Sequence, residues 1–183
     1  MKKSCKILAL VLAAVMMLAM FSGCQESAGN NEESDVLIVT LSPDFSPMEF
    51  VDTSKSGQDQ YVGFDVMLAK YIAEKLGKEL EIRAMSFDAC QMAVQLGTAD
   101  LSISGYSWTA DRAENYLMSD YYYAGDNAAT QTLIVRADEV DSYQSLEDFA
   151  GCSVGAQTAS LQMDLCNAQL PEDTDIQEFK AID

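Results

Sequence analysis

The sequence predicts an α/β fold built on a parallel, doubly wound sheet. From residue 35 onward, apolar runs typical of strands alternate with segments whose apolar residues recur every three or four positions, as in amphipathic helices. The first run, residues 36–40 (VLIVT), is rich in β-branched side chains, which is typical of a strand buried on both faces. Because strands that alternate with helices usually pair in parallel, we expect a layered α/β domain.

The clearest helix signal follows this strand. Residues 41–60 form a loop-rich stretch, and the helix is expected to begin after Gly63 and to end at Gly77, a common helix stop. Three- and four-residue spacing places a set of large apolar side chains on one face of this helix. The face expected to be buried consists of Phe64, Met67, Leu68, Tyr71, Ile72 and Leu76.

The remaining elements continue the alternation. We expect a strand at 80–84, a helix that begins at its cap Ser86 and runs through Leu96, and a strand at 101–103. A loop at 104–112 then leads to a helix at 113–117 and a strand at 132–135. A capping box at 145–148 begins the next helix, and a strand at 153–156 and a helix at 160–168 follow it. The unit that begins near residue 130 then has few elements before Asp183, so we expect it to be incomplete and too small to bury a core by itself.

The N-terminus has the pattern of an export signal. Three lysines precede the apolar run 7–21, which is shorter than the roughly 20 residues that span a bilayer. Residues 21–24 (FSGC) resemble a bacterial lipobox, which predicts a signal peptide at 1–23, lipidation of Cys24 and a tether at 24–34. The alternative is ordinary signal cleavage beside an incidental cysteine. We therefore expect an extracytoplasmic protein that is lipid-anchored to the bacterial membrane.

Charge and composition exclude several functions. Removing the signal removes three of the eleven basic residues and none of the 29 acidic ones, which changes the formal charge from −18 to −21. Such a chain repels phosphate backbones, so we expect no nucleic-acid partner. The sequence contains no histidine, which excludes Ser-His-Asp and Cys-His catalysis and imidazole zinc sites. We expect no metal and no cofactor. Cys90, Cys152 and Cys166 are expected to be free thiols, with a Cys152–Cys166 disulfide as the alternative.

A series of short motifs runs through the chain in a fixed order. They are residues 45–50 (FSPMEF), 63–68 (GFDVML), 96–100 (LGTAD), 104–112 (SGYSWTADR), 118–123 (MSDYYY) and 145–155 (SLEDFAGCSVG). Their order and spacing resemble the polar amino-acid-binding proteins of ABC transporters, which have the type II periplasmic-binding-protein fold. This resemblance implies two lobes joined by a hinge, a first lobe at 35–127 and the start of a second at 128–183.

The resemblance also implies the function. We expect a monomeric, non-catalytic protein that captures a free, polar amino acid between its lobes and presents it to an ABC permease in the membrane. One alternative is an enzyme on the same fold, similar to cyclohexadienyl dehydratases, although no paired-carboxylate motif is evident in residues 35–183. The other is the ectodomain of a sensor.

By motif position, the ligand's carboxylate is expected to bind Arg112. Arginine presents a planar fork that suits a carboxylate better than a lysine ammonium does. Ser104, Gly105 and Ser107 of the same motif are expected to lie beside it. The alternative is a surface arginine that pairs with a neighbouring acidic residue, either Asp111 or Glu114.

Three further residues are implied by the resemblance. Ser160 matches a serine at a helix N-terminus whose amide completes the carboxylate site, with Ala159 where the family has glycine; alternatively, Ser160 only caps its helix. Phe45 and Phe87 match aromatic residues that sandwich the ligand's side chain, and core packing is the alternative for both. The acidic partner of the ligand's ammonium group is expected beyond Asp183.

Overall fold

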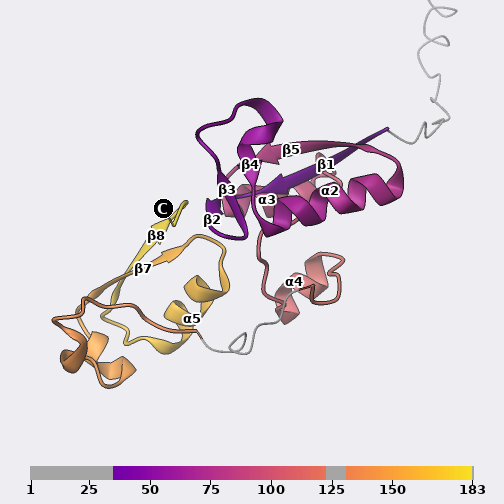
Figure 1. Cartoon of the computed structure of the whole chain (residues 1–183). Helices are drawn as coiled ribbons and strands as arrows, with labels where there is room; N and C mark the ends of the chain where they lie inside the picture. Colours follow the sequence, from indigo (N-terminus) through magenta and orange to yellow (C-terminus); the bar gives the residue numbers. More distant parts are fainter. Residues whose placement is uncertain (1–34, 123–130, 183) are drawn as a thin grey trace, which may run out of the picture. The chain divides into compact units, whose positions relative to one another are not determined.

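In the computed structural model, which describes residues 35–122 and 131–182, strands and helices alternate along the chain (Figure 1). The expected signal peptide, lipidation site and tether lie outside the described residues. Within those residues, no helix is both long and apolar enough to cross a membrane.

A three-stranded parallel sheet forms the first part of the fold. Strand β1 (Val36–Leu41) lies between β5 (Glu79–Ala84) and β6 (Leu101–Ser102), and both neighbours run parallel to it. The register places Val39 opposite Ile82 on one side and Leu101 on the other. All three strands agree with the sequence prediction.

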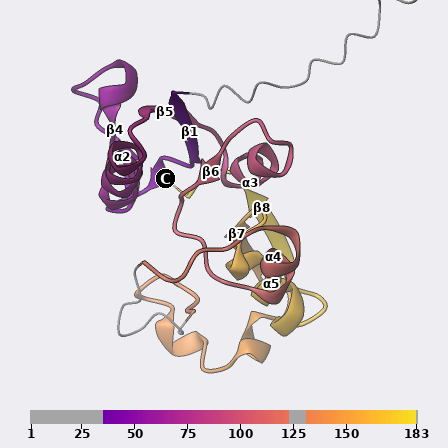
Figure 2. The same cartoon turned by 90° about the vertical axis from the view of Figure 1, so that its right-hand side faces the viewer.

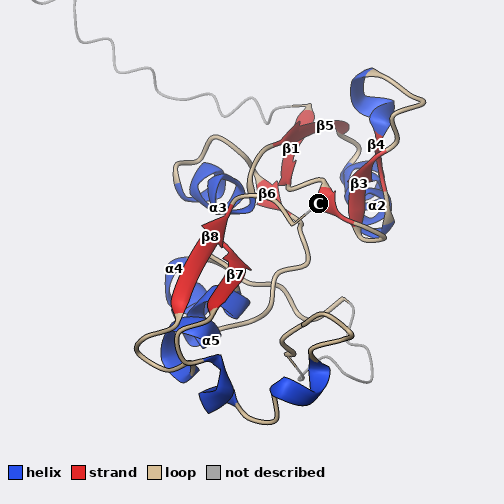
Figure 3. Ribbon diagram, turned by 90° about the vertical axis from the view of Figure 1, so that its left-hand side faces the viewer, coloured by secondary structure: helices blue, strands red, loops and turns tan. Residues whose placement is uncertain are grey.

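Two helices cover this sheet. Helix α2 (Phe64–Leu76) contacts β5, and helix α3 (Phe87–Gln95) contacts β1 and β6. Figures 2 and 3 show the strands between the two helices. On the α2 face, Leu37 and Val39 pack against Ala69 and Ala73. Successive residues of a strand point to opposite faces, and on the α3 face the hydroxyl of Thr40 bonds a helix carbonyl. The doubly wound arrangement is therefore confirmed.

The buried face of α2 differs from the predicted one. The helix buries Asp65, Val66, Ala69 and Ala73, whereas Met67 is 70% exposed and Phe64, Tyr71 and Leu76 are also exposed. Only two of the predicted residues, Leu68 and Ile72, pack against the core. The helix carries two apolar stripes, and the stripe with small side chains lets its backbone lie close to the sheet.

The stretch expected to be mainly loop contains a small antiparallel sheet. Its strands are β2 (Asp44–Phe45), β3 (Glu49–Val51) and β4 (Tyr61–Val62), with the 3₁₀ helix η1 (Gly57–Gln60) between the last two. Gln58 of η1 covers the edge of β5, because its side-chain amide accepts from the Ile82 N–H at 2.8 Å and donates to the Ile82 carbonyl at 3.1 Å. These bonds satisfy backbone groups that an edge strand otherwise exposes.

Helix α4 (Ala110–Asn115) begins three residues earlier than predicted. Thr109 is its N-cap, and the Thr109 hydroxyl accepts a hydrogen bond from the Arg112 N–H at 3.1 Å. Arg112 therefore lies inside the helix rather than in the loop before it.

The second part of the fold is built on a two-stranded parallel sheet. Strand β7 (Ser153–Gln157) pairs with β8 (Asp175–Phe179), and helix α5 (Leu161–Gln169) connects them (Figure 3). The 3₁₀ helices η2 (Val140–Ser142) and η3 (Leu146–Phe149) precede β7, and η3 begins at the predicted capping box. The core of this part contains Phe149, Val154 and Cys166.

The strand predicted at 132–135 is absent. Leu133 and Val135 pack against the same core, while Ile134 between them is 96% exposed. Buried and exposed side chains therefore alternate as in a strand, but the segment does not pair with another strand of the described residues. An unpaired backbone cannot form a ladder. Cys152 and Cys166 are free thiols, as is Cys90, so the disulfide alternative is not observed.

Candidate ligand-binding site

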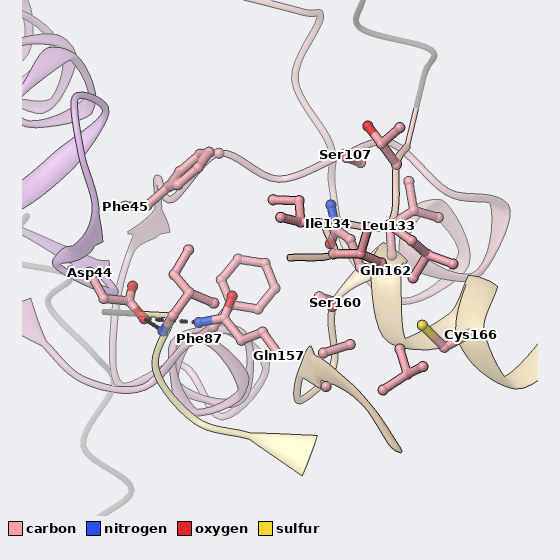
Figure 4. Close-up of a pocket in the computed structure, with 18 of the residues that line it drawn as sticks. Asp44, Phe45, Phe87, Ser107, Leu133, Ile134, Gln157, Ser160, Gln162 and Cys166 are labelled. Carbon is pink, nitrogen blue, oxygen red and sulfur yellow. Dashed lines mark hydrogen bonds between the residues drawn. The ribbon is translucent and has the colours of Figure 1, made fainter. Parts of the chain in front are cut away.

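Most of the predicted site residues lie around one cleft of about 840 Å³. In the first part of the fold, its walls come from β2, β3, the start of α3, the loop after β6 and α4. In the second part, they come from the segment 132–136, β7 and the start of α5. Every residue that the sequence nominated for ligand binding lines it: Phe45, Phe87, Ser104, Gly105, Ser107, Arg112 and Ser160. Figure 4 shows Phe45 and Ser107 on different parts of its wall. The structure thus brings the set together, and their contact with a ligand remains a prediction.

Arg112 is the buried cation of this site. Its side chain is 7% exposed, and its guanidinium donates through Nη1 to the Ser107 carbonyl at 2.7 Å and through Nη2 to the Ala159 carbonyl at 2.9 Å. The guanidinium carbon lies 5.7 Å from the ring centre of Phe87 and 5.4 Å from that of Tyr106. Two carbonyls and two aromatic faces therefore hold the fork in one position.

The alternative of a surface ion pair does not fit Arg112. Within the described residues, no carboxylate lies within ion-pairing distance of its guanidinium, neither Asp111 nor Glu114. Burial lowers the pKa of Arg112, because a charge loses solvation in the protein interior. An arginine still keeps its proton, and the charges of Asp164 and Asp111 act on it from a distance, but no carboxylate of the described residues forms an ion pair with it. Such a charge is costly unless an anionic partner arrives.

Ser104 and Gly105 already have partners within the protein. The Ser104 hydroxyl donates to Glu49 Oε1 at 2.6 Å, and the Gly105 N–H donates to Asp65 Oδ2 at 2.9 Å. Gly105 has φ of +59°, and a Cβ there would lie 3.0 Å from Cε1 of Phe45, so a side chain would displace that ring. These two residues shape the wall, and both donors are used by carboxyl groups within the protein.

The two phenylalanines differ in their exposure. Phe45 is exposed at the cleft, whereas Phe87 is buried, with its ring centre 4.7 Å from that of Tyr106. Phe87 therefore combines the two predicted alternatives, because it packs in the core and also lines the cleft. Phe45 has the more available aromatic face.

Ser160 is the N-cap of α5. Its hydroxyl accepts from the Met163 N–H at 3.1 Å, and its own N–H donates to the Gln157 carbonyl at 3.2 Å. The capping alternative is thus observed, and the amide that was expected to bind the ligand has an internal partner. The preceding Ala159 has φ of +60°, a left-handed conformation that glycine adopts more easily. Its carbonyl is the one that Arg112 contacts.

Sequence reasoning missed several polar residues of the cleft, among them Asp44, Glu49 and Gln157. Gln157 donates from its side-chain nitrogen to Asp44 Oδ2 at 3.1 Å, and the backbone N–H of Ile182 donates to the same oxygen at 3.0 Å (Figure 4). Asp44 comes shortly after the end of β1 and Gln157 is the last residue of β7, so both lie near the carboxyl ends of parallel strands, where such sheets place ligands. That topological signal could have indicated them.

The chain thus has an α/β fold with a cleft, and comparison with known proteins specifies its family. Residues 37–151 match the bacterial extracellular solute-binding proteins, family 3, and the chain belongs to that family. It is 34% identical over 167 residues to the arginine-binding extracellular protein ArtP of Bacillus subtilis, covering 91% of this chain and 61% of that protein. The chain thus spans less than two thirds of that relative's length.

Solved structures show the same similarity. The substrate-binding protein AbpA of Streptococcus pneumoniae, bound to L-arginine, matches with a TM-score of 0.72 and 39% identity, over 81% of this chain and 60% of that one. An ancestral amino acid-binding protein, described as a precursor of cyclohexadienyl dehydratase, matches with a TM-score of 0.69 and 30% identity, over 80% of this chain and 62% of that one. The type II periplasmic-binding-protein fold predicted from the motifs is thereby confirmed.

Proposed function

We propose that this protein captures a free amino acid in the cleft, outside the cytoplasm, and presents it to an ABC permease in the membrane. The observation that carries the proposal is Arg112, a buried guanidinium on the cleft wall with no carboxylate partner among the described residues. The α-carboxylate of an amino acid supplies the missing negative charge, and charge-assisted hydrogen bonds of this kind are the strong ones.

The other cleft residues suit the rest of such a ligand. In the proposal, Ser107 and Ser160 lie near the carboxylate, and Phe45 with Phe87 provides apolar surface for the side chain. The two lobes, 35–127 and 128–183, close by hinge motion when the ligand is bound. The Arg112–Ala159 contact supports this arrangement, because it joins helix α4 of the first proposed lobe to the residue before the N-cap of α5 in the second.

We further propose that the ligand is arginine. The names of the B. subtilis and S. pneumoniae proteins support this choice, because both are described with arginine. The Asp44 carboxyl on the cleft wall also supports it, since an anionic group favours a cationic side chain. In this proposal the protein binds its ligand without converting it, and the description of both relatives as binding proteins supports this.

A calorimetric titration tests this function. We expect L-arginine to bind the intact protein at least about tenfold more tightly than L-glutamine or L-glutamate, because one hydrogen bond to a charged group contributes roughly 1.5–3 kcal/mol and 1.4 kcal/mol is tenfold. The ligand should be recovered unchanged. If none of the three amino acids binds, the proposal is wrong. If the ligand is converted to a product, the dehydratase-like alternative is favoured.

The proposed location depends on the N-terminus. We propose that residues 1–23 are a signal peptide, that Cys24 is lipidated and that residues 24–34 tether the protein to the membrane. In a bacterium that processes lipoproteins, the mature N-terminal peptide should carry the mass of a diacylglycerol-modified cysteine. The Cys24→Ser variant should lose this mass and partition into the aqueous phase during detergent extraction. An unmodified Cys24 in the wild-type protein contradicts the anchor.

A further inference from the structure

Two carboxyl groups are buried beneath the cleft. Glu49 of β3 is 1% exposed and Asp65 of α2 is 0% exposed. Within the described residues, neither forms an ion pair with a lysine or an arginine. Two ionised carboxylates in such a place would repel one another and would both lack solvation.

Each carboxyl group holds part of the loop that follows β6. Glu49 Oε1 accepts from the Ser104 hydroxyl at 2.6 Å, and Asp65 Oδ2 accepts from the Gly105 N–H at 2.9 Å. Tyr122 Oη donates to the same Asp65 oxygen at 3.0 Å. Consecutive residues of the cleft wall are therefore attached to the two carboxyl groups.

The second oxygen of each group meets no donor among the described residues. These atoms are Glu49 Oε2 and Asp65 Oδ1, and both are fully buried. The two side chains bond the consecutive residues Ser104 and Gly105, and the charge of Asp65 acts on Glu49. A carboxylate only accepts hydrogen bonds, so the two groups can bond to one another only if one of them carries a proton.

The surroundings favour a proton on Glu49. Burial, reinforced by the Asp65 carboxylate, raises the pKa of Glu49 to about 9, although the Ser104 hydrogen bond acts in the opposite direction. The titratable groups that face Glu49 from the neighbouring elements are Asp44, Asp65, Cys90, Tyr106 and Tyr122. None of these is a cation, and burial raises the pKa of the Cys90 thiol to about 12 and of both tyrosines above their usual range.

We propose that Glu49 and Asp65 share a single proton and act together as positioning residues that hold Ser104 and Gly105 in the wall of the amino-acid site. The role in binding rests on the function proposed above, whereas the shared proton does not.

The pH dependence follows from the sign of the shift. The pKa of Glu49 is raised from 4.5 to about 9 in the folded protein, so between these values the folded state holds one proton more than the unfolded state. Stability therefore falls as the pH rises across this window and levels off above it. The loop keeps its position below the pKa of Glu49 and loses it as the pH rises through that value.

The decisive variant is Glu49→Gln, whose amide N–H replaces the shared proton. Thermal unfolding of the intact, ligand-free protein should show a wild-type melting temperature that falls by about 3 °C per pH unit between pH 6 and 9. Glu49→Gln should abolish this slope. The matched control is Glu81→Gln, at an exposed carboxyl paired with Arg83, which should keep the wild-type slope.

Affinity for L-arginine supplies the second readout. At pH 7, Glu49→Gln should bind within about threefold of wild type, whereas Glu49→Ala should bind at least about tenfold more weakly. At pH 10, the wild type should bind at least about tenfold more weakly than Glu49→Gln. The ammonium group of the ligand titrates in this range too, and comparing variants at the same pH cancels that effect.

Three outcomes separate the two proposals. If Glu49→Gln keeps the wild-type pH slope of melting, the shared proton is wrong. If the slope disappears but Glu49→Gln binds as weakly as Glu49→Ala at pH 7, the positioning role is wrong. If no variant binds arginine while a ¹³C-labelled carboxyl titrates near pH 9 only in the wild type, the ligand assignment fails and the shared proton stands.

Discussion

Replacing Arg112 by alanine will weaken arginine binding by about tenfold to several hundredfold. The reason is that a hydrogen bond to a charged group contributes roughly 1.5–3 kcal/mol, and a ligand carboxylate left unpaired in the cleft costs more than that. Arg112→Lys should also weaken binding, because an ammonium keeps the charge but loses the bidentate fork. Titration calorimetry of the intact protein measures both effects.

The best control for this prediction is Arg83→Ala. Arg83 pairs with Glu81 at 2.6 Å on the exposed side of β5 and does not line the cleft. Affinity should therefore be unchanged in Arg83→Ala. Arg136 lines the cleft and is therefore not a suitable control. Wild-type affinity in Arg112→Ala would mean that another group holds the carboxylate.

Replacing Gly63 by alanine will destabilise the protein by roughly 3–5 kcal/mol, because a strained backbone and a steric overlap combine at this residue. Gly63 has φ of +123°, and a Cβ would overlap the carbonyl oxygen of Met48 and lie 2.7 Å from its carbonyl carbon. The neighbouring atoms are backbone, so no side chain can move aside. The Met48 carbonyl also accepts a hydrogen bond from the Asp65 N–H at 2.9 Å, and this bond positions the start of α2.

Gly77→Ala is the matched control, since Gly77 also has a positive φ of +68° but no atom within 4 Å of an added Cβ. It should cost only about 1 kcal/mol. Urea unfolding of the two variants measures the difference. Equal destabilisation of Gly63→Ala and Gly77→Ala would show that the contact with Met48 relaxes freely.

Much of the fold could be predicted because its signals are local. The β-branched run at 36–40, the glycine that ends α2 and the capping box before η3 each act through neighbours in the sequence, and the structure contains β1, α2 and η3 at those places. The parallel pairing of β1 with β5 and β6 likewise follows from the alternation of strands with helices.

The wrong predictions concern residues whose structure depends on a partner that is distant in the sequence. Residues 132–135 have the composition of a strand, but a strand requires a second strand, and none of the described residues provides one. Periodicity marked Met67 and Tyr71 of α2 as buried, but the helix packs through Ala69 and Ala73 because small side chains permit closer approach to the sheet.

The site shows the same division. By itself, the order of the motifs determined the family resemblance and nominated Arg112, Phe45 and Ser160, all of which the structure brings to one cleft. Only the tertiary structure decided that Arg112 is buried without an ion-paired carboxylate among the described residues. It also decided that Glu49 and Asp65, 16 positions apart and in different elements, bond consecutive residues of one loop. Motifs and caps depend on residues adjacent in the chain. Desolvation and proton sharing depend on atoms that only folding brings together, so they were determined by the packing and not by the local pattern.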